Sequence, residues 1–421
     1  MKTVDTVIVG AGISGLATAA ALGPDADVRI FERDSEIGGY CKTVKQDGFV
    51  WDYSGHFFHF KHAAIEAWLR ERMPGQRLRN VNKKSFISFA GRHIDFPFQK
   101  NIHQLPPADF AECLHDLYFA RKPGAAVAPE NNFLEMLYAR YGRGIAEKFL
   151  IPYNEKLYAT DLRALDKDAM GRFFPHADLD AIIANMRQAD NASYNQHFTY
   201  PEGGAIEYVK AIASAVRPEA IALNEGVVRI DAAAKTVETT QGTWRFNRLV
   251  SSAPWPQLLG LLGQTPPQGL YTWNKVLVFN LGFSKKGPKD VHWVYFPDRS
   301  RAFYRIGFYD NIFDGDRMSL YVELGYGKDA PVDVERARAQ VLAGLKAEGI
   351  VTDHALVSSH HVVMDPAYVH ITQASQAAFT NESARLKAQG IHSIGRYGGW
   401  TYCSIEDNIV EARALVDSWK T

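Results

Sequence analysis

A G-x-G-x-x-G spacing near the start of the chain follows a short run rich in β-branched residues. Its glycines are Gly10, Gly12 and Gly15. They let the backbone turn tightly, approach a pyrophosphate and pack the next helix closely on its strand. A carboxylate, Glu32, ends the following apolar run 22 residues after Gly10, where a dinucleotide site needs an acceptor for ribose hydroxyls. The pattern predicts a dinucleotide whose pyrophosphate lies at a helix N-terminus.

A second glycine pair bears on which dinucleotide is bound. Arg33 follows Glu32 directly, and residues 37–42 read I-G-G-Y-C-K, with Gly39 as the second glycine of the pair. A glycine pair this close to the first turn suits an extended FAD with a long buried diphosphate better than a dissociable nicotinamide cofactor. We therefore expect FAD.

The cysteines and clustered histidines form no disulfide or metal pattern. Three cysteines without C-x-x-C spacing indicate a reduced, cytoplasmic protein in which they are packing residues: Cys41, Cys113 and Cys403. A spacing of three does not match a zinc motif in the histidines of the aromatic segment, His56, His59 and His62. We expect no metal.

The charge balance argues against polyanionic partners. The 421 residues carry 47 Lys plus Arg and 47 Asp plus Glu, so no overall field favours nucleic acid or an anionic membrane. We expect no membrane span because no run of about 18 apolar residues occurs, and Asp5 interrupts the stretch that resembles a secretory leader. With 46% hydrophobic residues, the chain is long enough for two or three interleaved domains.

Apolar periodicity divides the chain into a nucleotide-binding domain with two interruptions. Helical spacing dominates from residue 107 to 189, with helices expected at 110–120, 132–141, 144–150 and 179–189. Alternating runs between 274 and 324 predict an antiparallel sheet. We also expect a hairpin at 85–96 around residues 90–92, a strand at 355–363 and a glycine-containing loop at 396–402. The fold class is therefore α/β, a Rossmann-like FAD-binding domain with an inserted helical domain and an antiparallel substrate sheet. The expected bounds are 1–95 with 205–270 and 385–421 for the first, 100–200 for the second and 271–384 for the third. We expect the backbone at Val227 and Val228 to pair with adenine.

Further motifs occur in the same order as in the UDP-galactopyranose mutases. They read FPFQKN at 96–101, IPYNEKLY at 151–158, YPEGG at 200–204, WVYFP at 293–297, FYR at 303–305 and GRYGGWTY at 395–402. The chain resembles this family from Val7 to about Asn408, and it is more similar to the eukaryotic-type branch than to the common bacterial one.

The resemblance implies a redox-neutral flavoenzyme of nucleotide-sugar metabolism. Such an enzyme interconverts the pyranose and furanose forms of UDP-galactose, or of a related nucleotide sugar, in the supply of galactofuranose for cell-surface polysaccharides. Its FAD must be reduced, with NAD(P)H as one candidate reductant, because N5 attacks the anomeric carbon and displaces the nucleoside diphosphate. The substrate is a small molecule, and an oligomer is compatible with the sequence.

The resemblance also assigns roles to individual residues. Gly55 and His56 match a loop beside the flavin, in which Ser54 stands where the family has the first glycine of a pair. Arg305 matches the arginine that holds the diphosphate, whose charge grows in the transition state. Arg396 matches an arginine that contacts the flavin, and a helix starting near Ile405 directs its positive end at the same cofactor.

The remaining assignments concern the substrate channel and the cofactor. Tyrosine suits phosphate binding because its hydroxyl donates a hydrogen bond without adding charge. The implied substrate residues are Gln99, Asn154, Tyr158 in place of the family's usual tryptophan, Asn195, Tyr295, Tyr368 and Tyr402. The implied cofactor residues are Gly10, Gly12, Ser14, Gly15, Glu32, Arg33, Gly39, Lys42, Gly55, His56, Val228 and Arg396.

Two other classes remain open from the sequence. A net-redox flavoenzyme, such as an amine oxidase or desaturase, would share the N-terminal motifs but would need an apolar or amine-binding cavity instead of Arg305 and its tyrosines. A binding protein that has lost FAD, as in Rab GDP-dissociation inhibitors, disagrees with the intact glycines and Glu32. Without the resemblance, His56 and each of the tyrosines could also be ordinary packing residues with no role in a site.

Overall fold

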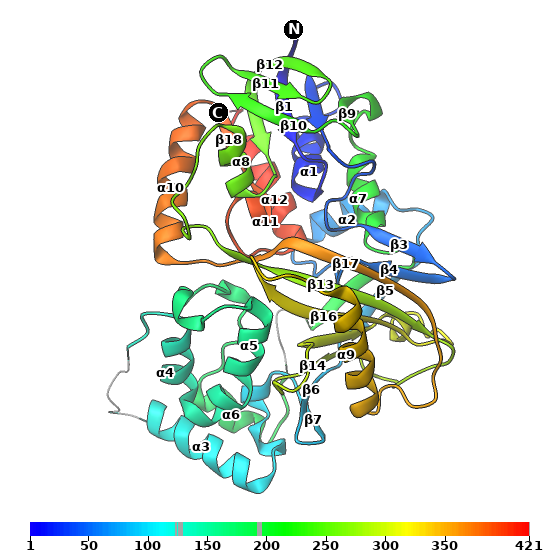
Figure 1. The fold of residues 1–421 in the computed structure, drawn as a ribbon, viewed down its shortest axis with the longest axis vertical. Helices are drawn as coiled ribbons and strands as arrows, with labels where there is room; N and C mark the ends of the chain where they lie inside the picture. The colour runs from blue at the N-terminus through cyan, green and yellow to red at the C-terminus, as the bar shows by residue number, and fades with distance from the viewer. Residues whose placement is uncertain (123, 125–128, 192–195, 421) are drawn as a thin grey trace.

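The chain folds into three parts that succeed one another along its long axis (Figure 1). The computed structural model describes residues 1–122, 124, 129–191 and 196–420. A Rossmann-like part contains blue, green and red segments, so N-terminal, central and C-terminal stretches lie together there. An antiparallel sheet crosses the middle of the molecule, and a group of helices lies at the other end. This arrangement confirms the predicted fold class.

The first sheet, called sheet 1, is the centre of the Rossmann-like part. Its strands are in the order β10-β11-β12-β1-β2-β9, with β18 paired to β12. Pairing is parallel from β18 through β12, β1 and β2 to β9, and antiparallel at β10 and β11. The strands are β1 (Lys2–Val9), β2 (Val28–Phe31), β9 (Ile221–Ala222), β10 (Val227–Asp231), β11 (Thr236–Thr239), β12 (Gly242–Ser251) and β18 (Ile391–Ser393).

Helices cover both faces of sheet 1, which explains the nearly continuous apolar run of β1. Alternate β1 residues enter different cores: Ile8 packs on one side, while Val7 and Val9 pack on the other. The first side carries α1 (Ile13–Leu22), α2 (Ala63–Glu71), α7 (Ile206–Ala213) and α12 (Ile405–Asp417). The second carries α8 (Trp255–Leu261) and α10 (Gln373–Ala388), and a short α11 (Gly395–Gly398) follows β18.

The second sheet, called sheet 2, has the order β17-β13-β16-β15-β14-β6-β7 and is antiparallel except between β14 and β6. Its strands are β6 (Ser85–Phe89), β7 (Arg92–Asp95), β13 (Trp273–Phe283), β14 (Trp293–Tyr295), β15 (Arg305–Phe308), β16 (Ser319–Gly327) and β17 (Leu356–Val369). Helix α9 (Val334–Ala347) packs on one face through an aliphatic and phenylalanine core. The other face carries most of the buried tyrosines of this sheet.

Three helices of the helical part match expected ones: α3 (Pro107–Arg121), α4 (Phe133–Ile145) and α6 (Leu179–Asn185). The stretch 144–150, expected as a separate helix, is the end of α4 and a π-helical turn (Ala146–Leu150), and α5 (Ile151–Tyr158) follows it directly. Two small ladders, β3 (Thr43–Gln46) with β4 (Phe49–Asp52) and β5 (Leu78–Asn82) with β8 (His197–Pro201), complete the fold.

Three local features differ from the sequence expectation. The hairpin β6–β7 lies within the expected 1–95 segment of the nucleotide-binding domain, yet it pairs with β14 and extends sheet 2. Strand β17 continues to Val369, beyond the expected end at Val363, because a register shift opposite Asn274 and Val276 accommodates the extra residues. The strand expected to reach Gly395 ends at Ser393, and a helical turn, α11, occupies Gly395–Gly398, which includes the start of the loop expected at 396–402.

Two features are absent from the described residues, a membrane-spanning helix and a metal-binding cluster. No helix among them combines the length and the apolar character that crossing a membrane requires. Nor does this part of the chain contain a group of three His, Cys, Asp or Glu side chains arranged to hold a metal ion.

Candidate active site

One cavity of about 700 Å³ is lined by residues of both sheets. Its volume lies within the range of about 300–1,000 Å³ that is typical of small-molecule and cofactor sites. Most of the residues singled out from the sequence lie on its wall: Gly10, Gly12, Ser14, Glu32, Arg33, Gly39, Lys42, Gly55, His56, Tyr295, Arg305, Tyr368, Arg396 and Tyr402. The fold therefore brings segments from the whole chain to one place.

The glycine turn at the cavity wall has no room for a side chain at Gly10 or Gly15. Gly10 has φ +96°, and a Cβ on Gly15 would lie 2.0 Å from the Gly10 carbonyl oxygen, so only glycine allows α1 to start so close to β1. Gly12 is the N-cap of α1 and faces Gly39, whose Cα would lie 3.9 Å from a Cβ on Gly12. This bare backbone at a helix N-terminus fits the diphosphate of a dinucleotide.

Two charged residues at this end are held by neighbouring groups. The Glu32 carboxylate accepts hydrogen bonds from the backbone N–H groups of Ala11 (2.8 Å) and Asp34 (3.0 Å). The buried Lys42 ammonium lies 2.7 Å from the Asp34 carboxylate. Burial alone would lower the pKa of Lys42, but the hydrogen bond and charge of Asp34 raise it overall. Glu32 is thus oriented at the cavity edge, whereas Lys42 already has an acidic partner.

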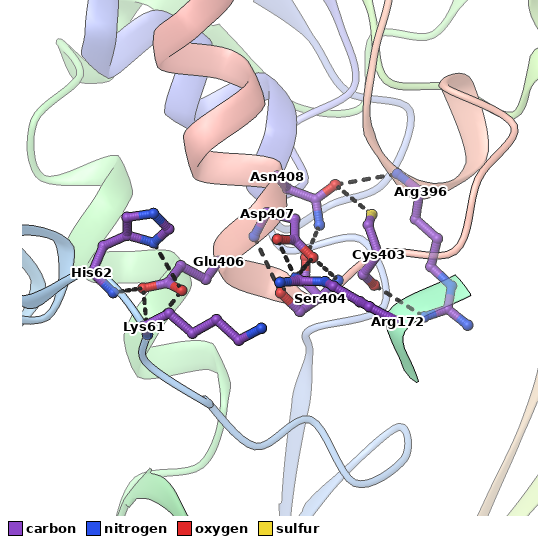
Figure 2. Close-up of polar contacts among 9 residues, drawn as sticks. All are labelled: Lys61, His62, Arg172, Arg396, Cys403, Ser404, Glu406, Asp407 and Asn408. Atoms are coloured by element: carbon purple, nitrogen blue, oxygen red, sulfur yellow. Dashed lines mark hydrogen bonds and ion pairs between the residues drawn. The ribbon is translucent and has the colours of Figure 1, made fainter. Parts of the chain in front are cut away.

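The start of α12 contacts the start of α1 through Asn408, which Figure 2 shows beside Arg396. Its Oδ1 accepts hydrogen bonds from Ser14 Oγ (3.0 Å) and from the Arg396 backbone N–H (3.1 Å). Ser404 caps the helix reciprocally with Asp407. Since Ser404, Ile405 and Asn408 also line the cavity, the positive end of α12 faces the cofactor space.

A contact from the helical part closes over this region. Arg172, in the turn Gly171–Phe173, forms an ion pair with Asp407 (Figure 2). The neighbouring Phe173 ring meets Tyr402 edge-on, with 4.9 Å between centroids, and lines the cavity. The Asp407 carboxylate is therefore engaged by Ser404 and Arg172 and does not point at the cofactor space.

Arg396 places a positive charge in the cavity wall. Its guanidinium carbon lies 4.3 Å from the Tyr402 ring centroid and 5.0 Å from that of Tyr368, and Nη1 donates a long hydrogen bond to the Cys403 carbonyl. Burial would lower the pKa of Arg396, but the surrounding tyrosines, Tyr397 first, raise it further above its ordinary value. The side chain stays charged, and it enters none of the ion pairs found in the described part of the chain.

The Gly55–His56 loop is half-buried and lines the cavity. A Cβ on Gly55 would lie 2.5 Å from Tyr321 Oη, so a side chain there would displace the loop. Burial, and then the charge of Arg396, lower the pKa of His56 to about 4. The imidazole is neutral at physiological pH, and its Nδ1 has no hydrogen-bond partner among the described residues.

Arg305 is held by a buried carboxylate on the next strand. Its Nε and Nη2 donate to the two oxygens of Glu323 at 2.7 and 2.8 Å, an arrangement that follows from their pairing across β15 and β16. Tyr295 is the partner of Arg305 on the other side, in β14. Burial raises the pKa of Tyr295 to about 12, against the opposing charge of Arg305, so its hydroxyl remains a donor.

A second wall is aromatic. The Tyr368 and Tyr402 rings are stacked at 5.8 Å with 14° between their planes. Burial raises the pKa of Tyr368, so this hydroxyl too stays protonated.

Burial raises the pKa values of Cys41 and Cys403 to about 12, and both thiols are therefore weak nucleophiles at neutral pH.

A smaller pocket of about 80 Å³ lies beside the main cavity and shares Arg305, Tyr295, Tyr368 and Tyr402 with it. Asn154 lines this pocket. Its Nδ2 donates to the Leu150 carbonyl (2.7 Å), while its buried Oδ1 has no hydrogen-bond partner among the described residues. The amide oxygen is thus oriented by the helix and available as an acceptor.

Four predicted residues do not line either cavity, and a fifth falls outside the described residues. Gln99 is fully buried and donates to the carbonyl of Pro175, behind the small pocket. Tyr158 is 1% exposed because the end of α5 turns it into the core. Val228 is 54% exposed at a bulge, while its neighbour Val227 lines the cavity. Gly15 acts through packing, as described above, and Asn195 lies outside the residues that the structure describes.

The sequence reasoning missed Glu323. Its signal was a lone acid in the apolar strand SLYVEL, on the same face as Ser319 and Tyr321. Because a carboxylate is rarely buried without a partner, this signal could have indicated a cationic neighbour, but no such prediction was made. The neighbour's identity, however, depended on strand register.

Comparisons with known proteins agree with this architecture. Residues 8–71 match a family model described as an NAD(P)-binding Rossmann-like domain. The structure of reduced UDP-galactopyranose mutase superimposes with a TM-score of 0.90 at 25% identity, covering 100% of this chain and 94% of that one. A putative protoporphyrinogen oxidase from Exiguobacterium sp. 255-15 gives a TM-score of 0.75 at 19% identity, covering 99% and 98%.

A curated relative, coproporphyrinogen III oxidase of Mycobacterium bovis, is 22% identical over 285 residues, which is 62% of this chain and 61% of that protein. The chain spans less than two thirds of the length of the first curated relatives it matches. Together with the glycine cradle and the cavity, these likenesses identify the fold. The chain has the fold of the FAD-dependent enzymes of the UDP-galactopyranose mutase and amine oxidase superfamily, with a Rossmann-like dinucleotide-binding domain at its N-terminus.

Proposed function

We propose that the protein is an FAD-dependent nucleotide-sugar mutase that interconverts pyranose and furanose forms of UDP-galactose or a related nucleotide sugar. The observation that carries this proposal is that one cavity joins the glycine turn to Arg305, Tyr295, Tyr368 and Tyr402. Reduced FAD would supply a nucleophilic nitrogen for the anomeric carbon. A eukaryotic-type affiliation, a cytoplasmic location and NAD(P)H as reductant belong to the same proposal.

Arg305 binds the substrate diphosphate in this scheme. Glu323 occupies Nε and Nη2 and fixes the plane of the guanidinium, so the remaining nitrogen, Nη1, is directed by that ion pair. A fixed cation costs no reorganisation when negative charge grows on the departing diphosphate. The ion pair with Glu323 thus orients the Arg305 guanidinium and also compensates for the burial of its charge.

The tyrosine hydroxyls complete the anion site without adding charge. Burial raises the pKa values of Tyr295 and Tyr368, so both stay protonated. Their hydroxyls and that of Tyr402 can each donate one hydrogen bond to a phosphate oxygen. Stacked rings also exclude water from the sugar, which protects the substrate from hydrolysis. Arg396 adds a second positive charge beside the same two rings.

The neutral His56 acts through the loop it occupies. Because its pKa is lowered to about 4, it is not a proton donor at neutral pH. Its unpartnered Nδ1 is a buried polar atom in a loop at the cavity, which supports a role beside the cofactor. Asn154 Oδ1 supports placing the nucleobase in the small pocket, where an acceptor can read an imide N–H.

The direct test uses protein whose flavin has been reduced with dithionite. Incubation with UDP-galactofuranose and other nucleotide furanoses, followed by chromatography, should show conversion to the pyranose without net consumption of electrons. No conversion of any furanose, together with hydrogen peroxide formed by oxidised protein and an amine, would reject the mutase.

A second candidate is an FAD-dependent oxidoreductase of the amine oxidase or desaturase type. It is favoured by the similarity to coproporphyrinogen III oxidase and to the putative protoporphyrinogen oxidase. The paired cations Arg305 and Arg396 in the cavity wall argue against a cationic amine substrate. Oxygen consumption with porphyrinogen or amine substrates would support this alternative.

A further inference from the structure

Segment 51–56 lies along one face of β16. The Trp51 indole N–H donates to Ser319 Oγ (2.8 Å), and Gly55 is packed against Tyr321, as described above. Ser319 and Tyr321 are two residues apart on a strand, so they share a face. The segment that carries His56 therefore packs on β16, the strand that pairs with the Arg305 strand β15, and it also lines the cavity.

The third contact in this series is a shared carboxylate. Ser54 Oγ donates a hydrogen bond to Oε1 of Glu323, two residues beyond Tyr321. The same oxygen accepts from Arg305 Nη2, and the other oxygen accepts from Arg305 Nε. The Glu323 side chain is 1% exposed, so water does not compete for it. One buried carboxylate thus holds both the His56 loop and the anion-binding guanidinium.

The two contacts cannot vary independently. When a phosphate binds Nη1 of Arg305, its negative charge competes with Glu323 for the guanidinium, and the charge-assisted hydrogen bonds to Glu323 weaken. The hydrogen bond that Glu323 accepts from Ser54 Oγ then strengthens, which draws the loop toward β16. By thermodynamic reciprocity, a loop position that favours one state of the cofactor must also change the affinity of the anion site.

We propose that Ser54 and Glu323 are positioning residues that couple anion binding at Arg305 to the loop carrying Gly55 and His56 beside the flavin. The proposal rests on the proposed function for the identities of the anion and the cofactor. Ser54 stands where the mutase family, by the resemblance above, has a glycine, which has no hydroxyl. The coupling is therefore a property of this chain's own residues.

The test measures affinity for UDP in two cofactor states. Calorimetric titration of the FAD-loaded protein, first oxidised and then reduced with dithionite, gives a ratio of two Kd values. For the wild type we expect a ratio of at least about fivefold, the lower end of ordinary allosteric coupling. Ser54→Ala should reduce the ratio to less than about twofold while changing the oxidised Kd little.

A matched control exists elsewhere in the chain. Ser88 Oγ donates to Glu348 (2.8 Å), and Glu348 accepts from Arg301 Nε (2.6 Å), so the same three residue types recur outside the cavity wall. Ser88→Ala should keep the wild-type ratio. Glu323→Gln should lose the coupling as Ser54→Ala does, but because it also leaves Arg305 without an ion pair, the serine variant is the decisive one.

The outcomes separate this proposal from the proposed function. A wild-type ratio near one, or an unchanged ratio in Ser54→Ala, overturns the coupling whether or not the protein is a mutase. Coupling that persists without conversion of any nucleotide furanose upholds the coupling and rejects the mutase. If neither UDP nor inorganic pyrophosphate binds the wild type, Arg305 is not an anion site and the coupling is rejected as well.

Discussion

The two ends of the cavity are built by different means. At the dinucleotide end, residues 9–42 of one continuous segment present bare backbone, and the side chains that matter, such as Glu32, are held by backbone N–H groups. At the substrate end, Arg305, Tyr368 and Tyr402 come from separate elements and are held by other side chains. Binding at the dinucleotide end thus requires backbone without side chains, whereas binding at the substrate end requires side chains from distant segments to come together.

The largest effect should come from adding a side chain at the dinucleotide end. Gly15→Val would place Cβ where only 2.0 Å separates it from the Gly10 carbonyl oxygen, so α1 could not start against β1. We expect the purified variant to lose nearly all bound FAD, measured as flavin absorbance per protein. Gly260→Val is the control, since nothing lies within 4 Å of a Cβ there. Full flavin content in Gly15→Val would contradict the claim that the dinucleotide end requires backbone without a side chain at this position.

Removing a side chain at the substrate end should leave the cofactor in place. In the proposed function Arg305 is the cation that stabilises the leaving diphosphate, so we expect kcat/KM of the mutase reaction to fall by about 10³-fold in Arg305→Ala. The protein should remain yellow. Arg301→Ala, which breaks the similar pair with Glu348 away from the cavity, is the control. Loss of FAD in Arg305→Ala would show that the two ends are not separable.

A smaller effect is expected from one tyrosine hydroxyl. Tyr368→Phe keeps the ring stacked on Tyr402 and removes one phosphate donor, so kcat/KM should fall by about tenfold, the loss expected for one hydrogen bond to a charged group. Tyr118→Phe, on the exposed face of α3, should have no effect. An unchanged rate in Tyr368→Phe would mean that this residue only packs.

The pH dependence tests the loop between the two ends. The folded-state pKa of His56 is lowered to about 4 from 6.5, so its contribution to stability is present above pH 6.5 and is lost as the pH falls through 4. The whole shift corresponds to about 3 kcal/mol. Thermal unfolding between pH 7 and 4 should therefore lower Tm more for the wild type than for His56→Asn. Equal losses would place His56 in contact with water.

The sequence predicted the dinucleotide end in detail because its determinants are local. The spacing from Gly10 to Glu32 encodes a strand, a turn and a helix, and each glycine is needed for a reason that holds within about 25 residues. The hairpin β6–β7 was also predicted, since the turn at Ala90 and Gly91 is local, but its place in sheet 2 was not.

At the substrate end, individual cavity residues were predicted only where a motif that resembles the mutase family indicated which position to choose. Arg305, Tyr295, Tyr368 and Tyr402 line the cavity as expected, whereas Gln99 and Tyr158 turn into the core beside it. A motif places the backbone of a residue near a site, but the direction of its side chain depends on packing that the motif does not contain. Val228 illustrates the same point, because a bulge exposes it.

By itself, the sequence determined the fold class and the dinucleotide turn, because helix and strand periods and glycine spacing act over short stretches of chain. Only the tertiary structure decided that Glu323 pairs with Arg305 and also accepts from Ser54, since strand register and the path of segment 51–56 bring these residues together. Local patterns specify which elements form. The partners of a buried charge are set by how distant elements pack.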